Sequence, residues 1–172
     1  MLVLAFAMAP RAEAGDLAPP SVCKHENLKA GTENARNAMV CMTNYARRKH
    51  GLHGFRNIHL LNVSSGRKAG DIKLCGFSHE ACGRPFTYWQ KRAGYLDGGG
   101  CYSVGENIAW GTGGLGTVRD IFNAWLHSSD HRAAILSSSY TQIGVGSKHG
   151  KFQGYGDASI WVQQFGTHHC PR

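Results

Sequence analysis

Two histidines and one glutamate, His79, His131 and Glu106, carry side chains that could form one polar site if folding brings them together. Neutral imidazoles and carboxylates are ligands for Zn²⁺ and similar divalent ions, and three protein ligands leave a position open for water. The same groups could instead hold a water molecule for general-base chemistry, with Glu106 as the catalytic group. Each residue also has a structural alternative, because an isolated histidine usually makes ordinary hydrogen bonds and a glutamate can accept backbone N–H bonds that fix its own loop.

Two other patterns resemble known site motifs. Residues 111–116 have the literal spacing G-x-G-x-x-G, but no βαβ unit surrounds them, so we expect no nucleotide cofactor. Residues 127–131 resemble the H-x-x-E-H pattern of zinc proteases, which needs one continuous helix. Ser128 to Asp130 indicates a helix end followed by a new cap, so the two histidines are not expected to share a face. No G-x-S-x-G nucleophile motif occurs.

The N-terminal residues indicate export. An apolar run over residues 2–9 is followed by Pro10 and by an A-x-A sequence before Gly15, which predicts a signal peptide over residues 1–14. No Lys or Arg precedes the run, as expected if the signal peptide is truncated at its N-terminus. The run is too short to span a bilayer, and no other segment is a candidate span. We therefore expect a secreted, extracellular protein.

The six cysteines all follow the predicted cleavage site, which favours three disulfides in an oxidising compartment. About 15 pairings are possible for six cysteines. Among them we expect Cys75 with Cys82, across the segment that carries His79, and Cys23 with Cys41. No C-x-x-C motif occurs, so we expect no structural zinc site and no thioredoxin-type site.

The chain is basic, with a formal net charge of +8 and a local basic run over residues 47–50. A basic stripe can bind nucleic acid, but a solvated helix face explains such a run more simply. Outside a cell, a basic protein meets anionic wall polymers or lipid headgroups. We expect a monomer whose partner is an extracellular small molecule, a lipid or an anionic wall polymer, and no nucleic-acid partner.

The order of elements predicts an α+β domain. Residues 15–31 are expected to form an extended N-terminal arm, and residues 32–172 a single domain. Apolar spacing predicts helices over about 32–51, 60–74, 85–93 and 117–126, and strands over about 104–110, 141–147 and 159–165. Helices mostly precede strands, which is typical of a layered α+β fold. The expected core contains Met39, Met42, Ile121, Phe122, Trp125, Ile143, Val145 and Val162.

Five motifs occur in an order that resembles bacterial members of the CAP superfamily, which comprises cysteine-rich secretory proteins, antigen 5 and pathogenesis-related proteins. The motifs are N-x-x-R with the following G-L (44–52), F-S-H (77–79), V-G-E-N-I-A (104–109), A-W-L with S-D-H-R-A-A-I-L (124–136), and the closing pair Y-T-Q-I-G-V-G and W-V-Q-Q-F-G (140–146 and 161–166). The resemblance covers about residues 32 to 166. It implies a bacterial-type secreted SCP domain, folded as a three-layer α-β-α sandwich with a small antiparallel sheet between helices.

The resemblance also implies a surface cleft with two histidines and two glutamates. His79 matches the first histidine, Glu106 the glutamate of G-E-N, and His131 the second histidine. The second glutamate usually follows the tryptophan of the fourth helix, but residues 126–129 contain no carboxylate. The sequence therefore predicts three metal ligands, His79, His131 and Glu106, that bind Zn²⁺ or another divalent metal weakly.

Two functional classes are compatible with such a cleft. In the first, the protein binds a divalent metal, a lipid or a wall component without turning it over; the resemblance implies sterol or lipid binding for some relatives. In the second, it is an extracellular hydrolase or peptidase that uses Glu106 and the histidines as general base or zinc ligands. The missing second glutamate and the lack of a nucleophile motif favour binding over catalysis.

Overall fold

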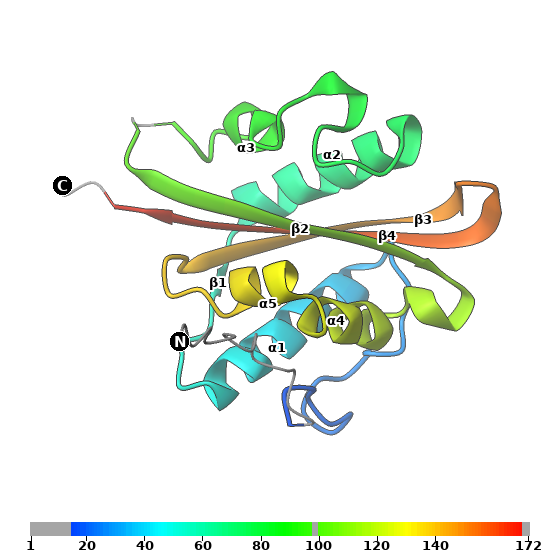
Figure 1. The fold of residues 1–172 in the computed structure, drawn as a ribbon, viewed down its shortest axis with the longest axis horizontal. Helices are drawn as coiled ribbons and strands as arrows, with labels where there is room; N and C mark the ends of the chain where they lie inside the picture. The colour runs from blue at the N-terminus through cyan, green and yellow to red at the C-terminus, as the bar shows by residue number, and fades with distance from the viewer. Residues whose placement is uncertain (1–14, 98–99, 170–172) are drawn as a thin grey trace, which may run out of the picture.

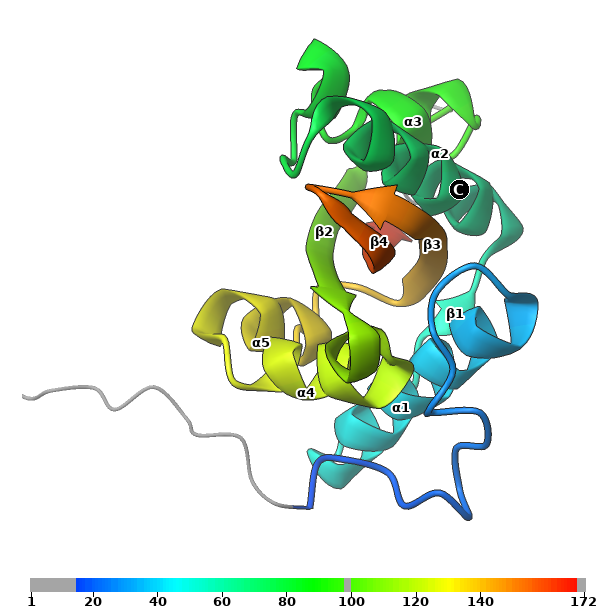
Figure 2. The same ribbon diagram turned by 90° about the vertical axis from the view of Figure 1, so that its right-hand side faces the viewer.

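The computed structural model describes residues 15–97 and 100–169, so the predicted signal peptide and Cys170 lie outside the described residues. The described chain forms three layers (Figure 1). Helices α2 (His59–Cys75) and α3 (Tyr88–Arg92) cover one face of a four-stranded sheet, whereas α1 (Glu33–Lys49), α4 (Val118–Leu126) and α5 (Ser129–Ile135) cover the other. The same layers separate in the turned view of Figure 2. The expected α-β-α sandwich is confirmed.

The sheet has the strand order β1-β3-β4-β2. Strands β2 (Tyr102–Thr112), β3 (Gln142–Phe152) and β4 (Tyr155–His168) are antiparallel neighbours, with β4 between the other two. The short β1 (Arg56–Asn57) pairs with β3 in parallel, so the sheet is antiparallel except at this edge. The sequence did not predict β1, because two residues are too few to show an alternating pattern.

Side-chain caps fix the starts of α1 and α4. Thr32 caps α1, its side-chain oxygen accepting a bond from the backbone N–H of Ala35 at 3.2 Å, and Thr117 caps α4 in the same way through Asp120. Helix α3 is shorter than predicted because a turn precedes it, in which Tyr88 donates to the carbonyl of Pro85. Two short 3₁₀ helices, η1 (Ala81–Gly83) and η2 (Gly113–Gly116), complete the elements.

The core has two parts, one on each face of the sheet. The larger part joins α1, α4 and α5 to the sheet, and the smaller part joins α2 to it. All eight residues expected in the core are buried: Met39, Met42, Ile121, Phe122, Trp125, Ile143, Val145 and Val162. The apolar periodicity of α1 and α4 therefore identified the faces that meet the sheet.

Helix α2 packs directly on β3 because two glycines of that strand leave room for it. A Cβ atom at Gly144 would lie 2.2 Å from the carbonyl carbon of Leu61, and one at Gly146 would lie 2.0 Å from that of Ser65. Any side chain at either position would push α2 off the sheet. This close approach fixes the height of α2, and with it the segment that follows its C-terminus.

Both expected disulfides are present, Cys23–Cys41 and Cys75–Cys82. Cys101 is also disulfide-bonded. The Cys75–Cys82 bridge ties the end of α2 to η1, and so closes a short loop that contains His79.

The basic run over residues 47–50 is not simply a solvated helix face, as the sequence had suggested. Arg47 is buried, and its guanidinium donates hydrogen bonds to the carbonyls of His53, Ile135 and Ser137. It also lies over the ring of Phe55, 3.6 Å from the ring centroid. Burial lowers the pKa of Arg47 to about 10. Arg47 thus joins α1 to the C-terminal end of α5.

Candidate functional site

The structure brings His79, Glu106 and His131 together at the edge of the sheet that β2 forms. The Nδ1 atom of His79 lies 2.9 Å from Oε1 of Glu106. His79 and His131 line the same cleft, and the charge of His79 affects the titration of His131. Three separate elements supply these residues: the loop after α2, the middle of β2, and α5.

Glu106 lies behind His79 rather than in the open. Its side chain is 1% exposed, whereas that of His79 is 52% exposed. The second carboxylate oxygen, Oε2, accepts a hydrogen bond of 2.8 Å from Nε2 of Gln164, the residue opposite Glu106 in the β2–β4 register. Both carboxylate oxygens therefore have partners, and the side chain is held between the sheet and the imidazole.

The position of His79 is fixed by α2. Lys68 of α2 is buried, and its ammonium group donates a hydrogen bond to the backbone carbonyl of His79. Burial lowers the pKa of Lys68, while the nearby carboxylates of Glu106, Asp71 and Glu80 act in the opposite direction. With the Cys75–Cys82 bridge, this bond holds the loop at a set distance from β2.

His131 lies in the first turn of α5, and its ring is anchored locally. Its Nδ1 atom is 2.7 Å from Oγ of Ser128, and its carbonyl accepts a bond from the amide of Asn107 on β2. The pKa of His131 is lowered chiefly by burial and further by nearby His79, whereas Asp130 raises it. His131 therefore stays neutral to a lower pH than an exposed histidine does.

The cleft in front of these residues has a volume of about 590 Å³. It is lined by Phe77, Ser78, His79, Glu80, Ile108 and His131. Phe77 is a large apolar side chain that remains exposed, and Ile108 contributes a buried apolar floor. Two imidazoles and a small apolar surface thus face the same space, while Glu106 is not among the lining residues.

The hydrogen bonds assign chemical roles to the two rings. An ionised carboxylate only accepts, so Nδ1 of His79 carries the proton toward Glu106 and a neutral ring keeps its Nε2 lone pair. His131 likewise uses Nδ1 for Ser128, leaving its other nitrogen outside that contact. Within residues 15–97 and 100–169, no group of three His, Cys, Asp or Glu side chains is arranged to hold a metal ion. In this arrangement the available ligands are two imidazoles, with Glu106 as the group that orients one of them.

The sequence did not identify the partners of the three residues. Gln164 and Ser128 hold Glu106 and His131, and Lys68 holds the backbone of His79. Gln164 could have been found from strand register, because it lies opposite Glu106 once β2 and β4 are paired. Lys68 carried no sequence signal, since a lysine on a helix is ordinarily exposed.

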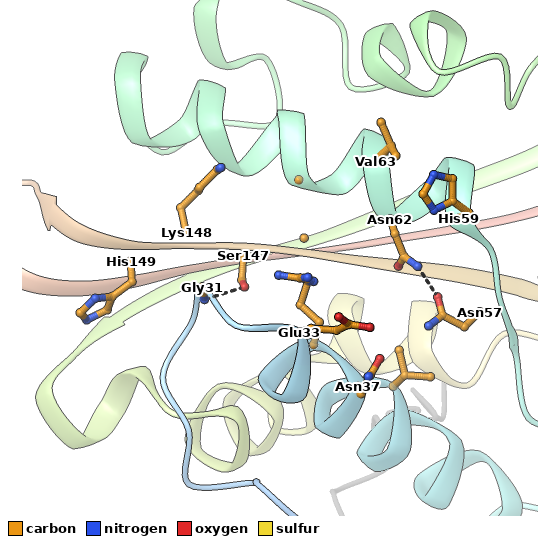
Figure 3. Close-up of a pocket in the computed structure, with 14 residues that line it drawn as sticks. Gly31, Glu33, Asn37, Asn57, His59, Asn62, Val63, Ser147, Lys148 and His149 are labelled. Carbon is orange, nitrogen blue, oxygen red and sulfur yellow. Dashed lines mark hydrogen bonds between the residues drawn. The ribbon is translucent and has the colours of Figure 1, made fainter.

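A second hollow of about 600 Å³ lies between the start of α1, α2 and the edge of β3. Figure 3 shows the side chains of Asn62, Ser147 and Lys148 around it. Some of its polar groups are hydrogen-bonded: Asn62 donates to Asn57 and accepts from the N–H of Val145, and Ser147 accepts from the N–H of Gly31. None of the three predicted site residues lines this hollow.

Comparison of the sequence with known protein families identifies one family. A model of the cysteine-rich secretory protein family, CAP, matches residues 40–165. An uncharacterized protein of Bacillus subtilis, YkwD, is 33% identical over 130 residues, which cover 74% of this chain and 45% of that protein. An uncharacterized membrane protein of the same organism, YlbC, is 29% identical over 134 residues, covering 77% of this chain and 37% of that protein. The chain thus spans less than half the length of these curated relatives.

Solved structures share the fold. An extracellular protein of Bacillus anthracis that contains an SCP domain superposes with a TM-score of 0.62 at 22% identity, covering 87% of this chain and 43% of that one. An outer surface protein of Borrelia burgdorferi gives a TM-score of 0.64 at 19% identity, covering 83% of this chain and 99% of that one. In the described part of this chain, no helix is long and apolar enough to cross a membrane.

Proposed function

Because the chain belongs to the cysteine-rich secretory protein family, CAP, we propose that it is an exported binding protein whose cleft holds a small extracellular ligand against His79 and His131. The observation that carries the proposal is the pairing of a buried carboxylate with an exposed imidazole at the cleft wall. A carboxylate held in this way costs free energy to bury, and its effect is to fix the ring of His79 in one tautomer.

The ligand has a polar and an apolar part. The imidazoles of His79 and His131 supply hydrogen-bonding or metal-binding nitrogens, and Phe77 and Ile108 supply apolar surface beside them. A lipid or a wall component with one polar group fits this mixture better than a fully charged polymer does. The volume of about 590 Å³ accommodates a molecule of ordinary ligand size.

A divalent ion such as Zn²⁺ fits the same two nitrogens. His79 and His131 would hold it, and the ion would supply Lewis acidity in the cleft. Glu106 would orient His79 from behind, as carboxylates commonly do for metal-binding histidines. Two protein ligands are too few for a closed structural site, so the binding would be weak and folding would not depend on it.

One observation supports a hydrolase as the second candidate function. The His79–Glu106 pair has the arrangement of a general base and the carboxylate that orients it. Among the lining residues, the hydroxyl of Ser78 accepts a bond from the N–H of Glu80, so it is used locally. Water would have to be the nucleophile. Cleavage of a generic peptide library, with and without chelator, distinguishes this class from binding alone.

The proposal is tested by what the exported protein carries. Native mass spectrometry of protein purified from culture supernatant should show a bound small molecule with the unaltered chain. The variant Phe77→Asp places a charge on the apolar wall and should remove that molecule, whereas Leu115→Asp, at another exposed apolar residue, should retain it. Protein that carries no molecule, or an equal load in both variants, would contradict ligand binding in this cleft.

A further inference from the structure

A pocket of about 320 Å³ lies against the outer helical layer, between α2 and α3. It is lined by Val63, Ser64, Arg67, Trp89, Arg92 and Ala93. The two helices lie side by side on the same face of the sheet (Figure 1). The pocket shares no lining residue with the His79–His131 cleft, so it is a separate feature of the molecule.

Two arginines face this pocket without an acidic partner. Within the part of the chain that the structure describes, the guanidinium groups of Arg67 and Arg92 form no hydrogen bond and no ion pair. The contrast is Arg84 on the neighbouring segment, which pairs with Asp71 at 2.7 Å. Two guanidinium groups beside one hollow repel each other weakly, and an anion between them would remove that repulsion. Guanidinium groups also match phosphate oxygens with paired N–H donors.

The pocket wall contains a buried hydroxyl with no partner. Ser64 lines the pocket and is fully buried, yet its Oγ makes no hydrogen bond in the described structure. A helical serine ordinarily donates to a carbonyl one turn back, and Ser64 does not. The amide of Gln90, which follows Trp89 in α3, is also buried and has neither its oxygen nor its nitrogen satisfied. Gln90 does not line the pocket, but Ser64 does. Unsatisfied buried polar atoms are rare in folded proteins, so the hydroxyl of Ser64 indicates a missing polar partner at the pocket wall.

Trp89 gives the pocket a rigid aromatic wall. Its indole N–H donates to Asp71 at 2.7 Å, which fixes the ring, and the guanidinium of Arg67 lies 5.9 Å from the ring centroid. A ligand that binds the arginines would therefore also contact the face or edge of this ring. Aromatic surface beside cationic groups suits an anion that carries a short carbon chain.

We propose that the Arg67–Arg92 pocket binds the phosphate group of a small phosphate ester, with its carbon part against Trp89; a glycerol phosphate ester is the simplest probe of this chemistry. The net charge of +8 favours the approach of such anions. Glycerol phosphate occurs both as a soluble phosphate and as the headgroup of an anionic lipid, and the pocket recognises the chemistry that the two share. The volume of about 320 Å³ admits one such group.

Calorimetric titration of the full chain with glycerol 1-phosphate tests the proposal. We expect saturable binding, weakened about tenfold or more in Arg67→Ala and in Arg92→Ala, because each loses a charge-assisted contact to phosphate. Arg67→Lys keeps the charge but loses the paired donors, so its affinity should lie between that of the unaltered chain and that of Arg67→Ala. The matched control is Arg48→Ala, an exposed arginine on α1 in the opposite layer, which removes the same charge and should bind as the unaltered chain does.

A second arm identifies the source of the phosphate. Vesicles of phosphatidylglycerol, compared with vesicles of phosphatidylcholine, should be bound in an Arg67-dependent way if the ligand is a lipid headgroup; if only the free ester binds, the ligand is soluble. Absence of binding to both probes overturns the proposal. So does equal weakening by Arg67→Ala and Arg48→Ala, which would indicate general charge attraction. Thermal unfolding of each variant confirms that a loss of binding is not a loss of fold.

Discussion

The carboxylate of Glu106 lies directly behind the ring of His79, with Oε1 at 2.9 Å from Nδ1, so the buried acid acts on the cleft only through the exposed base. Gln164 holds the other carboxylate oxygen from the neighbouring strand. The sheet therefore carries the carboxylate, and the loop after α2 carries the imidazole that faces the cleft. Predictions about the cleft depend on this division of roles.

Replacing Glu106 by Gln should weaken Zn²⁺ binding about 10- to 100-fold, the usual effect of losing a carboxylate behind a metal-binding histidine. In either orientation, the amide nitrogen of the new side chain would face a donor, Nδ1 of His79 or Nε2 of Gln164, so one of the two hydrogen bonds would be lost. Calorimetric titration measures the change. The control is Glu80→Gln, which removes the same charge from the cleft lining without touching the ring of His79. Similar weakening in both variants would argue against an orienting role.

Removing the Cys75–Cys82 bridge by a double serine substitution should lower the free energy of unfolding by about 2–3 kcal/mol, as expected for a short closed loop. It should also weaken Zn²⁺ binding, because the loop carries His79. The Cys23–Cys41 bridge provides the comparison, since its removal should cost at least as much stability but leave Zn²⁺ affinity unchanged. If neither double variant affects Zn²⁺ binding, the bridge does not position His79.

Stability should depend on pH through His131. Its pKa in the folded protein is lowered, mainly by burial, so as the pH falls below about 6.5 the unfolded chain takes up this proton first. The stability that a neutral His131 contributes is therefore present above that pH and lost as the pH falls through the folded-state value. Urea unfolding at neutral and mildly acidic pH should show a larger loss for the unaltered chain than for His131→Asn. An identical loss in both proteins would exclude this contribution.

Truncating Trp125 to Ala should destabilise the protein by about 3–5 kcal/mol, as for other large buried aromatic residues. Trp125 is buried in the larger part of the core, and its indole N–H donates to the carbonyl of Ile108, next to the cleft. Thermal unfolding measures the effect, with Leu115→Ala, at an exposed apolar residue, as the control. An unchanged melting temperature would remove Trp125 from the set of residues that hold the fold.

Export remains a prediction from the N-terminal sequence. Signal cleavage after residue 14 should give a mature protein that begins at Gly15. The intact mass of protein from culture supernatant decides the point. Protein that keeps residues 1–14 and stays in the cytosol would contradict export.

Periodicity predicted the strongly amphipathic helices α1 and α4 and the residues that they bury, because helical spacing is local information. The motif order predicted that His79, Glu106 and His131 come together, although only the two histidines line the cleft and Glu106 lies behind His79. What the sequence could not predict depends on contacts between distant segments. Arg47 is buried because its guanidinium binds the carbonyls of Ile135 and Ser137, at and just after the end of α5. Glu106 is buried because Gln164 and His79 enclose its carboxylate. The burial of Arg47 and that of Glu106 therefore cannot be predicted from their neighbours in the sequence.

The role of His79 and His131 is tested most directly by titrating the metal-free protein with Zn²⁺ near neutral pH and again at mildly acidic pH. The unaltered chain and the control His127→Ala, at an exposed neighbouring histidine, should bind one ion with the same affinity, and binding should weaken as the imidazoles become protonated. The double variant His79→Ala/His131→Ala should lose this binding while keeping its fold. If the double variant binds Zn²⁺ as tightly as the unaltered chain, the two imidazoles are not the ligand-binding groups, and the His79–Glu106 pair is a structural network.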